Sequence, residues 1–250
     1  MLSSSNARLA VARRLTRRSA RRETGRFLAE GAQAVREALA ADAVVELFAT
    51  AEAIGRYPEL TGDAAEISVK DAAALSETVT PQGLVAVCRL VQPSLADVLA
   101  RGPRLLAVLV EPNDPGNLGT IVRTADAAGA DAVVLDGGVD VYNGKAVRAS
   151  AGSLFHLPVV TASVAEVLDS DLSTLATSGE GRRDLDDLAD DGTLAGPTAW
   201  LFGTEAHGLP AAVLDAATHT VRVPIHGRAE SLNLAAAAAV CLYASARARR

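Results

Sequence analysis

The chain has 250 residues, of which 49% are hydrophobic, and a formal net charge of −6. That length is sufficient for one large domain or two modest ones with a substantial core. No uninterrupted apolar run approaches the length of a membrane span, so the composition excludes a membrane-spanning protein and is typical of a soluble, globular one.

The two cysteines, Cys88 and Cys241, both lie among apolar neighbours. Because neither belongs to a CxxC pair or has a histidine at metal-ligand spacing, we interpret them as small buried hydrophobes rather than as a disulfide or a metal site. Free thiols fit a reducing cytoplasm, and no apolar secretory stretch follows the start. We therefore expect a cytoplasmic protein without a bound metal.

Charge is distributed unevenly along the chain. Residues 1–26 carry eight arginines and one acid; subtracting them from the totals of 24 basic and 30 acidic residues leaves 16 and 29, a net charge of −13. A basic amino-terminal segment on an otherwise acidic chain predicts a local contact with a polyanion. Two alternatives stay open at this point: a solvated basic helix, or an organellar transit peptide rich in Ser and Arg.

The amino-terminal third is predicted to form a small α/β unit that ends near residue 93. Its expected elements are a basic helix over 6–22, a turn at Gly31 followed by an amphipathic helix up to residue 40, strands at 43–50, 66–71 and 84–91, and a turn at 80–83. Residues 92–104 are predicted to form a connector with a short helix.

The remainder alternates between apolar strands and helices. Strands are expected at 105–111, 131–137, 157–161, 198–203 and 219–225, with helices around 119–129, 143–153, 163–170 and 210–217 and a long Ala-rich one from 231. Such alternation predicts a buried parallel sheet. The acidic stretch 179–196 is expected to be a surface connection.

Three strand exits carry unusual loops. EPNDPGNLGTIVRTA (111–125) follows one apolar run, LFGTEAHGLP (201–210) holds one carboxylate, and VPIHGRAESLNL (223–234) opens the final helix. Ligands of α/β proteins bind where parallel strands end. Each loop also has a purely structural explanation, since Ser231 and Asn233 are good helix caps and glycines form turns. The GxGxxG and P-loop patterns are absent from all three loops.

Taken together, the three loops resemble the SpoU (TrmH-like) family of S-adenosylmethionine-dependent RNA 2′-O-ribose methyltransferases. The resemblance covers residues 105–247 and rests on the three family motifs, which occur in order. The first motif is matched by Asn117, Gly119, Arg123, Thr124 and Ala125, the second by Gly203, Glu205 and Gly208, and the third by Pro224, Ser231, Leu232 and Asn233. The stretch 140–159 is also similar to the family's middle segment.

The amino-terminal part resembles the ribosomal-protein-like α/β RNA-binding domain that precedes the catalytic domain in many family members. The resemblance implies an RNA-binding domain at 1–93 and a catalytic domain at 94–250. The catalytic domain is expected to have an α/β fold with a parallel sheet, and its carboxyl end is expected to form a deep trefoil knot. It makes RNA the expected polyanion and argues against a transit peptide. The expected RNA contacts are Arg8, Arg13, Arg17, Arg21, Arg22 and, more weakly, Arg148.

The family likeness also implies the cofactor site. S-adenosylmethionine is expected at the second and third motifs, on Gly203, Glu205, Gly208, Val223, Ile225 and Leu232. Adenine needs apolar walls and backbone hydrogen bonds, which these residues supply, although the three apolar side chains also suit an ordinary core. Family members build one site from two subunits, so we expect a homodimer, and the Ala-rich final helix permits the close packing that this requires.

The likeness assigns the central catalytic role to Arg123. Because a guanidinium stays charged at ordinary pH, clamping a phosphate beside the reacting hydroxyl is a better role for it than acting as a base, and a surface salt bridge is the structural alternative. Asn117, Ser231 and Asn233 are expected to orient Arg123 and the ribose, and Glu205 to hold the loops or Asn117. Ribosomal RNA is the favoured substrate and transfer RNA the second; a non-catalytic RNA-binding protein would lack these motif residues.

Overall fold

The computed structural model describes residues 1–249, which form two compact units. The first unit comprises Met1–Val91 together with Asp140–His156, and the second comprises Gln92–Val139 and the chain from Leu157 onward. The segment 140–156 therefore belongs to the first unit, although the sequence prediction places it in the catalytic domain. The predicted boundary at residues 93/94 coincides with only one of the places where the chain passes between units.

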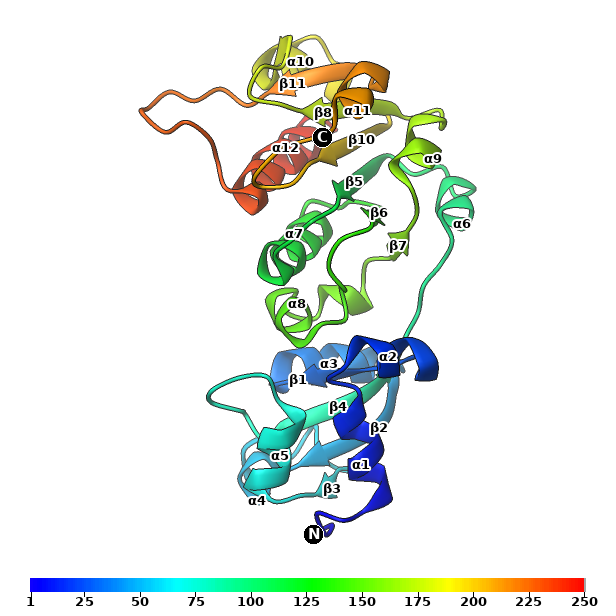
Figure 1. Cartoon of the computed structure of the whole chain (residues 1–250), viewed down its shortest axis with the longest axis vertical. Helices are drawn as coiled ribbons and strands as arrows, with labels where there is room; N and C mark the ends of the chain where they lie inside the picture. Colours follow the sequence, from blue (N-terminus) through cyan, green and yellow to red (C-terminus); the bar gives the residue numbers. More distant parts are fainter. Residues whose placement is uncertain (250) are drawn as a thin grey trace. The chain divides into compact units, whose positions relative to one another are not determined.

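The first unit is built on a four-stranded sheet in the order β1-β4-β2-β3 (Figure 1). The central strand β4 (Leu84–Arg89) pairs antiparallel with β1 (Arg26–Glu30) and with β2 (Val44–Ala49), and β2 pairs parallel with β3 (Ala65–Glu66). Its helices are α1 (Ala7–Arg14), α2 (Arg18–Thr24), α3 (Ala32–Ala40), α4 (Ala51–Arg56), α5 (Val69–Leu75) and α8 (Gly144–Ala149), with a short 3-10 turn, η1 (Ser153–Phe155).

Local chemistry explains where the sequence predictions for this unit were wrong. The single helix expected over 6–22 is two helices, because Arg17 has extended backbone and α2 begins after it. Residues 26–30 form a strand that was not predicted, paired along its length with β4. The strand expected at 66–71 ends at Glu66, because the Ser68 hydroxyl accepts a hydrogen bond from the Asp71 amide and caps α5.

The segment 140–156 is fixed to the first unit by its side chains. The Phe27 ring lies 4.6 Å from the Tyr142 ring and 5.9 Å from the Phe155 ring, measured between centroids. The buried guanidinium of Arg21 donates to Asp140 at 2.7 and 3.0 Å. A buried ion pair of this kind specifies a partner, since either charge left alone would lack solvation.

The second unit contains a seven-stranded sheet, parallel throughout, in the order β7-β6-β5-β10-β8-β11-β9. The strands are β5 (Leu105–Val110), β6 (Ala132–Asp136), β7 (Val159–Thr161), β8 (Ser173–Thr177), β9 (Arg183–Asp184), β10 (Thr198–Phe202) and β11 (His219–Arg222). The five predicted strands are confirmed. Strands β8 and β9 were not predicted, and the acidic stretch 179–196 contains β9 and α10 rather than only a surface connection.

Helices cover both faces of this sheet. They are α6 (Leu95–Leu99), α7 (Pro115–Ala127), α9 (Val164–Leu168), α10 (Leu185–Asp190), α11 (Ala211–Ala216) and α12 (Leu234–Ala248), with a 3-10 turn η2 (Thr193–Ala195). Leu106, Val108 and Val110 of β5 pack with apolar residues of α6, α9 and α11. The intervening side chains of β5 point to the opposite face, as strand geometry requires, where α7 and α12 lie. Among residues 1–249 no helix is long and apolar enough to cross a membrane.

We predict that Asp140→Ala destabilises the first unit by about 3 kcal/mol or more, because it leaves the Arg21 guanidinium buried without its carboxylate. The control is Glu59→Ala, which removes the exposed Arg36–Glu59 pair and should change the free energy of unfolding by less than about 1 kcal/mol. Urea unfolding followed by circular dichroism measures both variants. Equal effects would show that the Arg21–Asp140 pair is no more important than a surface pair.

Candidate active site

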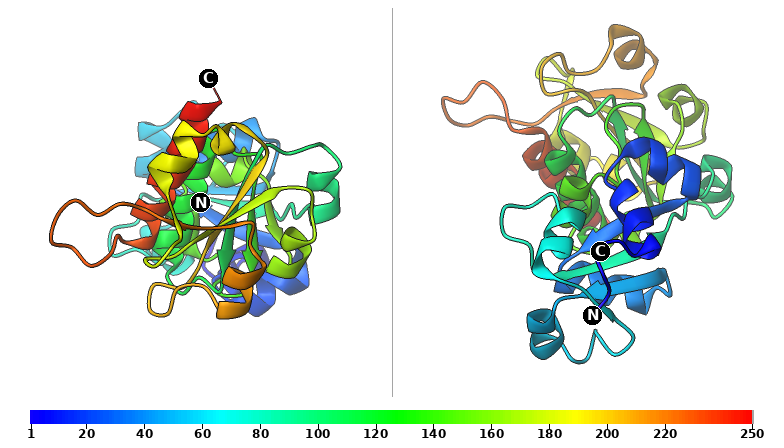
Figure 2. Two further views of the ribbon diagram at one scale, coloured as in Figure 1. Left: turned by 90° about the horizontal axis from the view of Figure 1, so that it is seen from above. Right: turned by 60° about the horizontal axis from the view of Figure 1, so that its bottom comes forward.

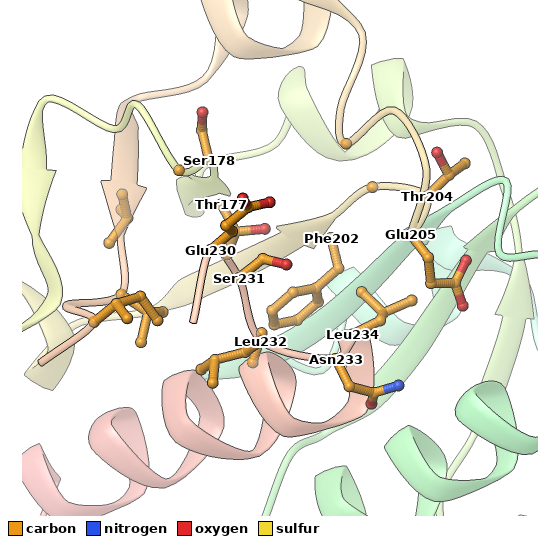
Figure 3. A pocket seen from close by; sticks show the side chains of 17 residues that line it. Thr177, Ser178, Phe202, Thr204, Glu205, Glu230, Ser231, Leu232, Asn233 and Leu234 are labelled. Atoms are coloured by element: carbon orange, nitrogen blue, oxygen red, sulfur yellow. The ribbon is translucent and has the colours of Figure 1, made fainter. Parts of the chain in front are cut away.

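A cavity of about 360 Å³ opens at the carboxyl edge of the second unit's sheet. Its walls come from the residues that follow three neighbouring strands, β10, β8 and β11, and from the start of α12 (Figure 3). Carboxyl ends of parallel strands meet at one edge, so loops that are distant in sequence converge there. This volume is in the range of sites for small organic ligands.

The cavity collects most of the predicted cofactor and catalytic residues. Those that line it are Gly203, Glu205, Gly208, Val223, Ile225, Ser231, Leu232 and Asn233. Ile225 and Leu232 are 37% and 38% exposed, so they are not ordinary core residues. The loop that carries them, between β11 and α12, stands out from the rest of the second unit (Figures 1 and 2).

Three loops are joined by a chain of hydrogen bonds between side chains. Asn233 caps α12 through its oxygen, which accepts from the Ala235 amide at 2.9 Å, and its amide nitrogen donates to the Asn117 oxygen at 3.3 Å. The Asn117 nitrogen in turn donates to Glu205 at 2.7 Å. Since each amide oxygen is already committed, each nitrogen has a fixed direction. The structure thus places Glu205 against Asn117, and Asn233 is also a helix cap.

Gly203 is required by its own loop. A Cβ atom at this position would overlap the backbone of Gly208 and Leu209, because Thr204 and Gly208 form a two-way backbone bridge at 3.1 and 2.9 Å. Gly208 has a φ of +67°, which favours glycine. The prediction that Gly203 allows a cofactor to approach closely therefore has a second, structural reason beside it.

Arg123 lies on α7 and does not line the cavity. Its side chain is exposed, and within the part of the chain that the structure describes it forms no hydrogen bond or ion pair. The structural alternative of a surface salt bridge is therefore excluded for residues 1–249. Asn117 of the first motif does not line the cavity either, but it forms hydrogen bonds with Glu205 and Asn233, which do.

Sequence reasoning missed Thr177, Ser178 and Gly179, which line the cavity at the end of β8. The Thr177 hydroxyl donates to the Leu201 carbonyl at 2.9 Å and so ties β8 to β10. The only signal in the sequence was weak, since STLAT has the length of a strand and is followed by small residues, but only two of its five residues are apolar. The acidic residues after it obscured the strand.

The predicted RNA-contacting arginines lie in the first unit and divide into two groups. Arg21 is buried, and one of its guanidinium nitrogens donates to the carbonyls of Leu15 and Thr16 at 2.8 and 3.0 Å. An arginine so enclosed is not positioned to meet RNA, so its burial argues against the predicted contact of Arg21. Arg148 is a weaker case, because it is half-buried and lies 3.4 Å from Glu30.

The arginines of α1 are also engaged with carboxylates. Arg8 pairs with Glu46 and remains exposed, and Arg13 pairs with the buried Asp71 at 2.5 Å. A hydrogen bond from Ser68, with others from Ser4 and Arg13, lowers the pKa of Asp71, so this pair persists at neutral pH. Arg17 and Arg22, in contrast, are exposed and form no such pairs within residues 1–249.

The cavity's chemistry fits S-adenosylmethionine. Phe202, Val223, Ile225, Leu232 and Leu234 give apolar walls for a purine, and the glycine-rich turn at 203–208 and the loop after β8 present backbone groups between them. Hydroxyl and carboxylate groups at the rim, from Thr177, Ser231 and Glu230, suit a polar amino-acid tail (Figure 3). These residues would hold the cofactor.

The comparisons agree with this chemistry. The model of the SpoU rRNA Methylase family matches residues 104–243, and that of the MRM3-like substrate binding domain matches residues 6–86. A 23S rRNA (guanosine(2553)-2′-O)-methyltransferase, RlmP of Bacillus subtilis, is 35% identical over 248 residues, which cover 96% of each chain.

Two solved structures extend the likeness. The AdoMet-bound rRNA methyltransferase of Sinorhizobium meliloti is 30% identical and superposes with a TM-score of 0.83, covering 99% of this chain and 97% of that one. A structure described as concerning the 2-OH methylation of C/U34 on tRNA is 32% identical with a TM-score of 0.52, and it covers 57% of this chain and 94% of that one. The chain therefore belongs to the SpoU rRNA methylase family of S-adenosylmethionine-dependent RNA 2′-O-ribose methyltransferases.

Proposed function

We propose that this enzyme methylates the 2′-hydroxyl of one ribose in ribosomal RNA of the 23S type, in the cytoplasm. The observation that carries the proposal is the cavity whose rim is joined to the first motif by the Asn233–Asn117–Glu205 chain, because it unites a cofactor-sized site with the motif that bears Arg123. The proposed arrangement includes the trefoil knot and an RNA-binding domain ahead of a catalytic one.

Ribosomal RNA is favoured over transfer RNA because of the extent of the likeness. The relative and the neighbour named for ribosomal RNA cover 96% and 99% of this chain, including the first unit. The neighbour concerned with tRNA covers 57% and has a length that matches a catalytic domain alone. A separate substrate-binding unit is the part that would distinguish one RNA from another.

In the proposed mechanism the cofactor, when bound, supplies a methyl group that is already activated as a sulfonium. The chain's own residues then have to position the ribose hydroxyl and help its proton leave. Arg123 is free to hold a phosphate next to that ribose at two oxygens, which fixes the nucleotide and stabilises negative charge near the hydroxyl. Asn117 and Asn233, with directions set by their hydrogen bonds, orient the ribose, and Ser231 offers a hydroxyl at the same rim.

The position of Arg123 supports a homodimer. The arginine lies outside the cavity of its own chain, while the neighbouring helix α12 exposes a stripe on one face: Ala236, Val240, Tyr243 and Arg247. Val240 and Tyr243 are 42% and 52% exposed. Because these residues recur at helical spacing, a second copy can cover them through the same face, and two-fold symmetry would bring Arg123 of one chain toward the cavity of the other.

The RNA target is tested with purified enzyme, labelled S-adenosylmethionine and two in vitro transcripts, full-length 23S ribosomal RNA and a transfer RNA pool. We expect label in the 23S RNA at a single ribose, mapped by resistance to alkaline cleavage, and at least tenfold less label in the tRNA. Label confined to tRNA would overturn the target, and no transfer to either RNA would overturn the activity.

We expect Arg123→Lys and Arg123→Ala each to lower the rate of methyl transfer at least about a hundredfold. Lysine keeps the positive charge but lacks the planar guanidinium that can bind two phosphate oxygens at once, and alanine lacks both. Calorimetric affinity for S-adenosylmethionine should stay within about threefold of wild type, since Arg123 does not line the cavity. Arg101→Lys, at another exposed position, is the control. Near-wild-type turnover of Arg123→Lys would remove the clamp from the mechanism.

The shared site is tested by subunit complementation. A chain with Arg123→Ala and a chain with Leu232→Asp, each inactive alone, should regain about a quarter of wild-type activity when mixed and allowed to exchange subunits, because one site of each mixed dimer has both groups intact. An arginine that serves its own chain's cavity would give no recovery. Val240→Asp should make the protein monomeric in sedimentation, whereas Val69→Asp, at an exposed position in the first unit, should not.

A further inference from the structure

The arginines of the first unit differ in what they have left to bind. On α1, Arg8 and Arg13 are paired with Glu46 and Asp71. At the next stretch of chain, Arg17, Arg22 and Arg26 are exposed and form no ion pair or side-chain hydrogen bond within residues 1–249. Unpaired guanidinium groups keep their full charge and all five donors available to a ligand.

These three arginines lie within one short bend of the chain, residues 17–26, which we call the elbow. Arg17 is the N-cap of α2, Arg22 lies on its exposed side, and Arg26 begins β1 directly after the left-handed Gly25. The buried face of α2 consists of Ala20 and Arg21. Side chains at the other positions of the helix therefore point away from the core of the unit.

Arg21 anchors this elbow from beneath. Its guanidinium binds the Leu15 and Thr16 carbonyls at the end of α1 and the Asp140 carboxylate at 2.7 Å, so it fixes the angle between α1 and α2. A buried arginine with each of these partners holds the backbone that carries the exposed ones. Arg21 thus acts as a positioning residue for its neighbours.

The acids beside the elbow are already neutralised. Glu23 pairs with Arg14 at 2.9 Å, and Asp140 pairs with Arg21. The local field is therefore positive, whereas the chain after residue 26 has a net charge of −13. A polyanion approaching the protein would be attracted to the elbow and repelled by most of the remaining surface.

We propose that the elbow formed by Arg17, Arg22 and Arg26 is a phosphate-binding patch for the backbone of the substrate RNA; this inference rests on the proposed function. RNA is favoured over an acidic protein because guanidinium forks spaced along one stretch of chain match the repeated phosphates of a nucleic acid, and such contacts position a strand without reading its bases.

The test compares two triple variants of the full chain, Arg17→Gln/Arg22→Gln/Arg26→Gln and the control Arg56→Gln/Arg101→Gln/Arg182→Gln. The control removes the same charge from exposed positions outside the patch. Filter binding of full-length 23S RNA over a range of salt concentrations gives the dependence of log affinity on log salt. Calorimetry with S-adenosylmethionine confirms that each variant keeps its catalytic unit.

We expect the patch variant to bind this RNA at least tenfold more weakly and its salt slope to fall by about two, since each phosphate contact contributes roughly 0.7 to 0.9. The control should change the slope by less than one. An equal change in both variants, or no change in the patch variant, would contradict the proposed patch. No change in the patch variant is also the result expected if the elbow binds an acidic protein instead of RNA. If wild-type enzyme binds 23S RNA but transfers no methyl group to it, the proposed function fails while the patch is still judged by the slopes.

Discussion

The side chain of Asn117 connects three parts of the sequence that are far apart along the chain. Its nitrogen donates to Glu205, 88 residues away, and its oxygen accepts from Asn233, 116 residues away. Because the Asn233 oxygen is held by the first amides of α12, the order of donors and acceptors along the chain is fixed from one end. Without this amide, the three segments would each have to be ordered separately, at a cost in conformational entropy.

The sheet order makes that connection available. Strand β10 lies between β5 and β8, so the loop that carries Glu205 emerges beside the first turn of α7, which follows β5 and carries Asn117. On the other side, β8 and β11 bring Thr177 and Val223 to the same edge. The cavity is therefore a consequence of strand order, and its chemistry is a consequence of which residues follow each strand.

The sequence was sufficient for the part of this arrangement that depends on local pattern. Apolar runs predicted five of the seven parallel strands, and the motif residues Gly203, Ser231 and Leu232 do meet at one cavity. Strand β8 was missed because its five residues, STLAT, include two threonines and a serine and precede an acidic stretch. Its burial comes from its neighbours in the sheet, β10 and β11, which are distant in sequence and so do not contribute to the local pattern of apolar residues.

Charge was harder to interpret than hydrophobicity, for a physical reason. Eight arginines in 26 residues predict a basic surface, but a guanidinium is equally suited to bind RNA or to satisfy carbonyls and carboxylates inside the protein. Arg21 does the second, and its partner Asp140 lies 119 residues away. Composition alone therefore overestimates the charge that is free for a ligand, and only the pairing pattern separates the two uses.

Arg123 shows the opposite relation between pairing and function. Arg123 is exposed and, within residues 1–249, has no ion pair or hydrogen bond, so its guanidinium is solvated and keeps its donors available for an incoming group. A residue left in that state beside a well-ordered motif is best explained by a group that arrives from outside. In the proposed mechanism the chain itself builds the cavity, whereas bound RNA supplies the partner for the charge on Arg123, which would separate cofactor binding from the step that requires substrate.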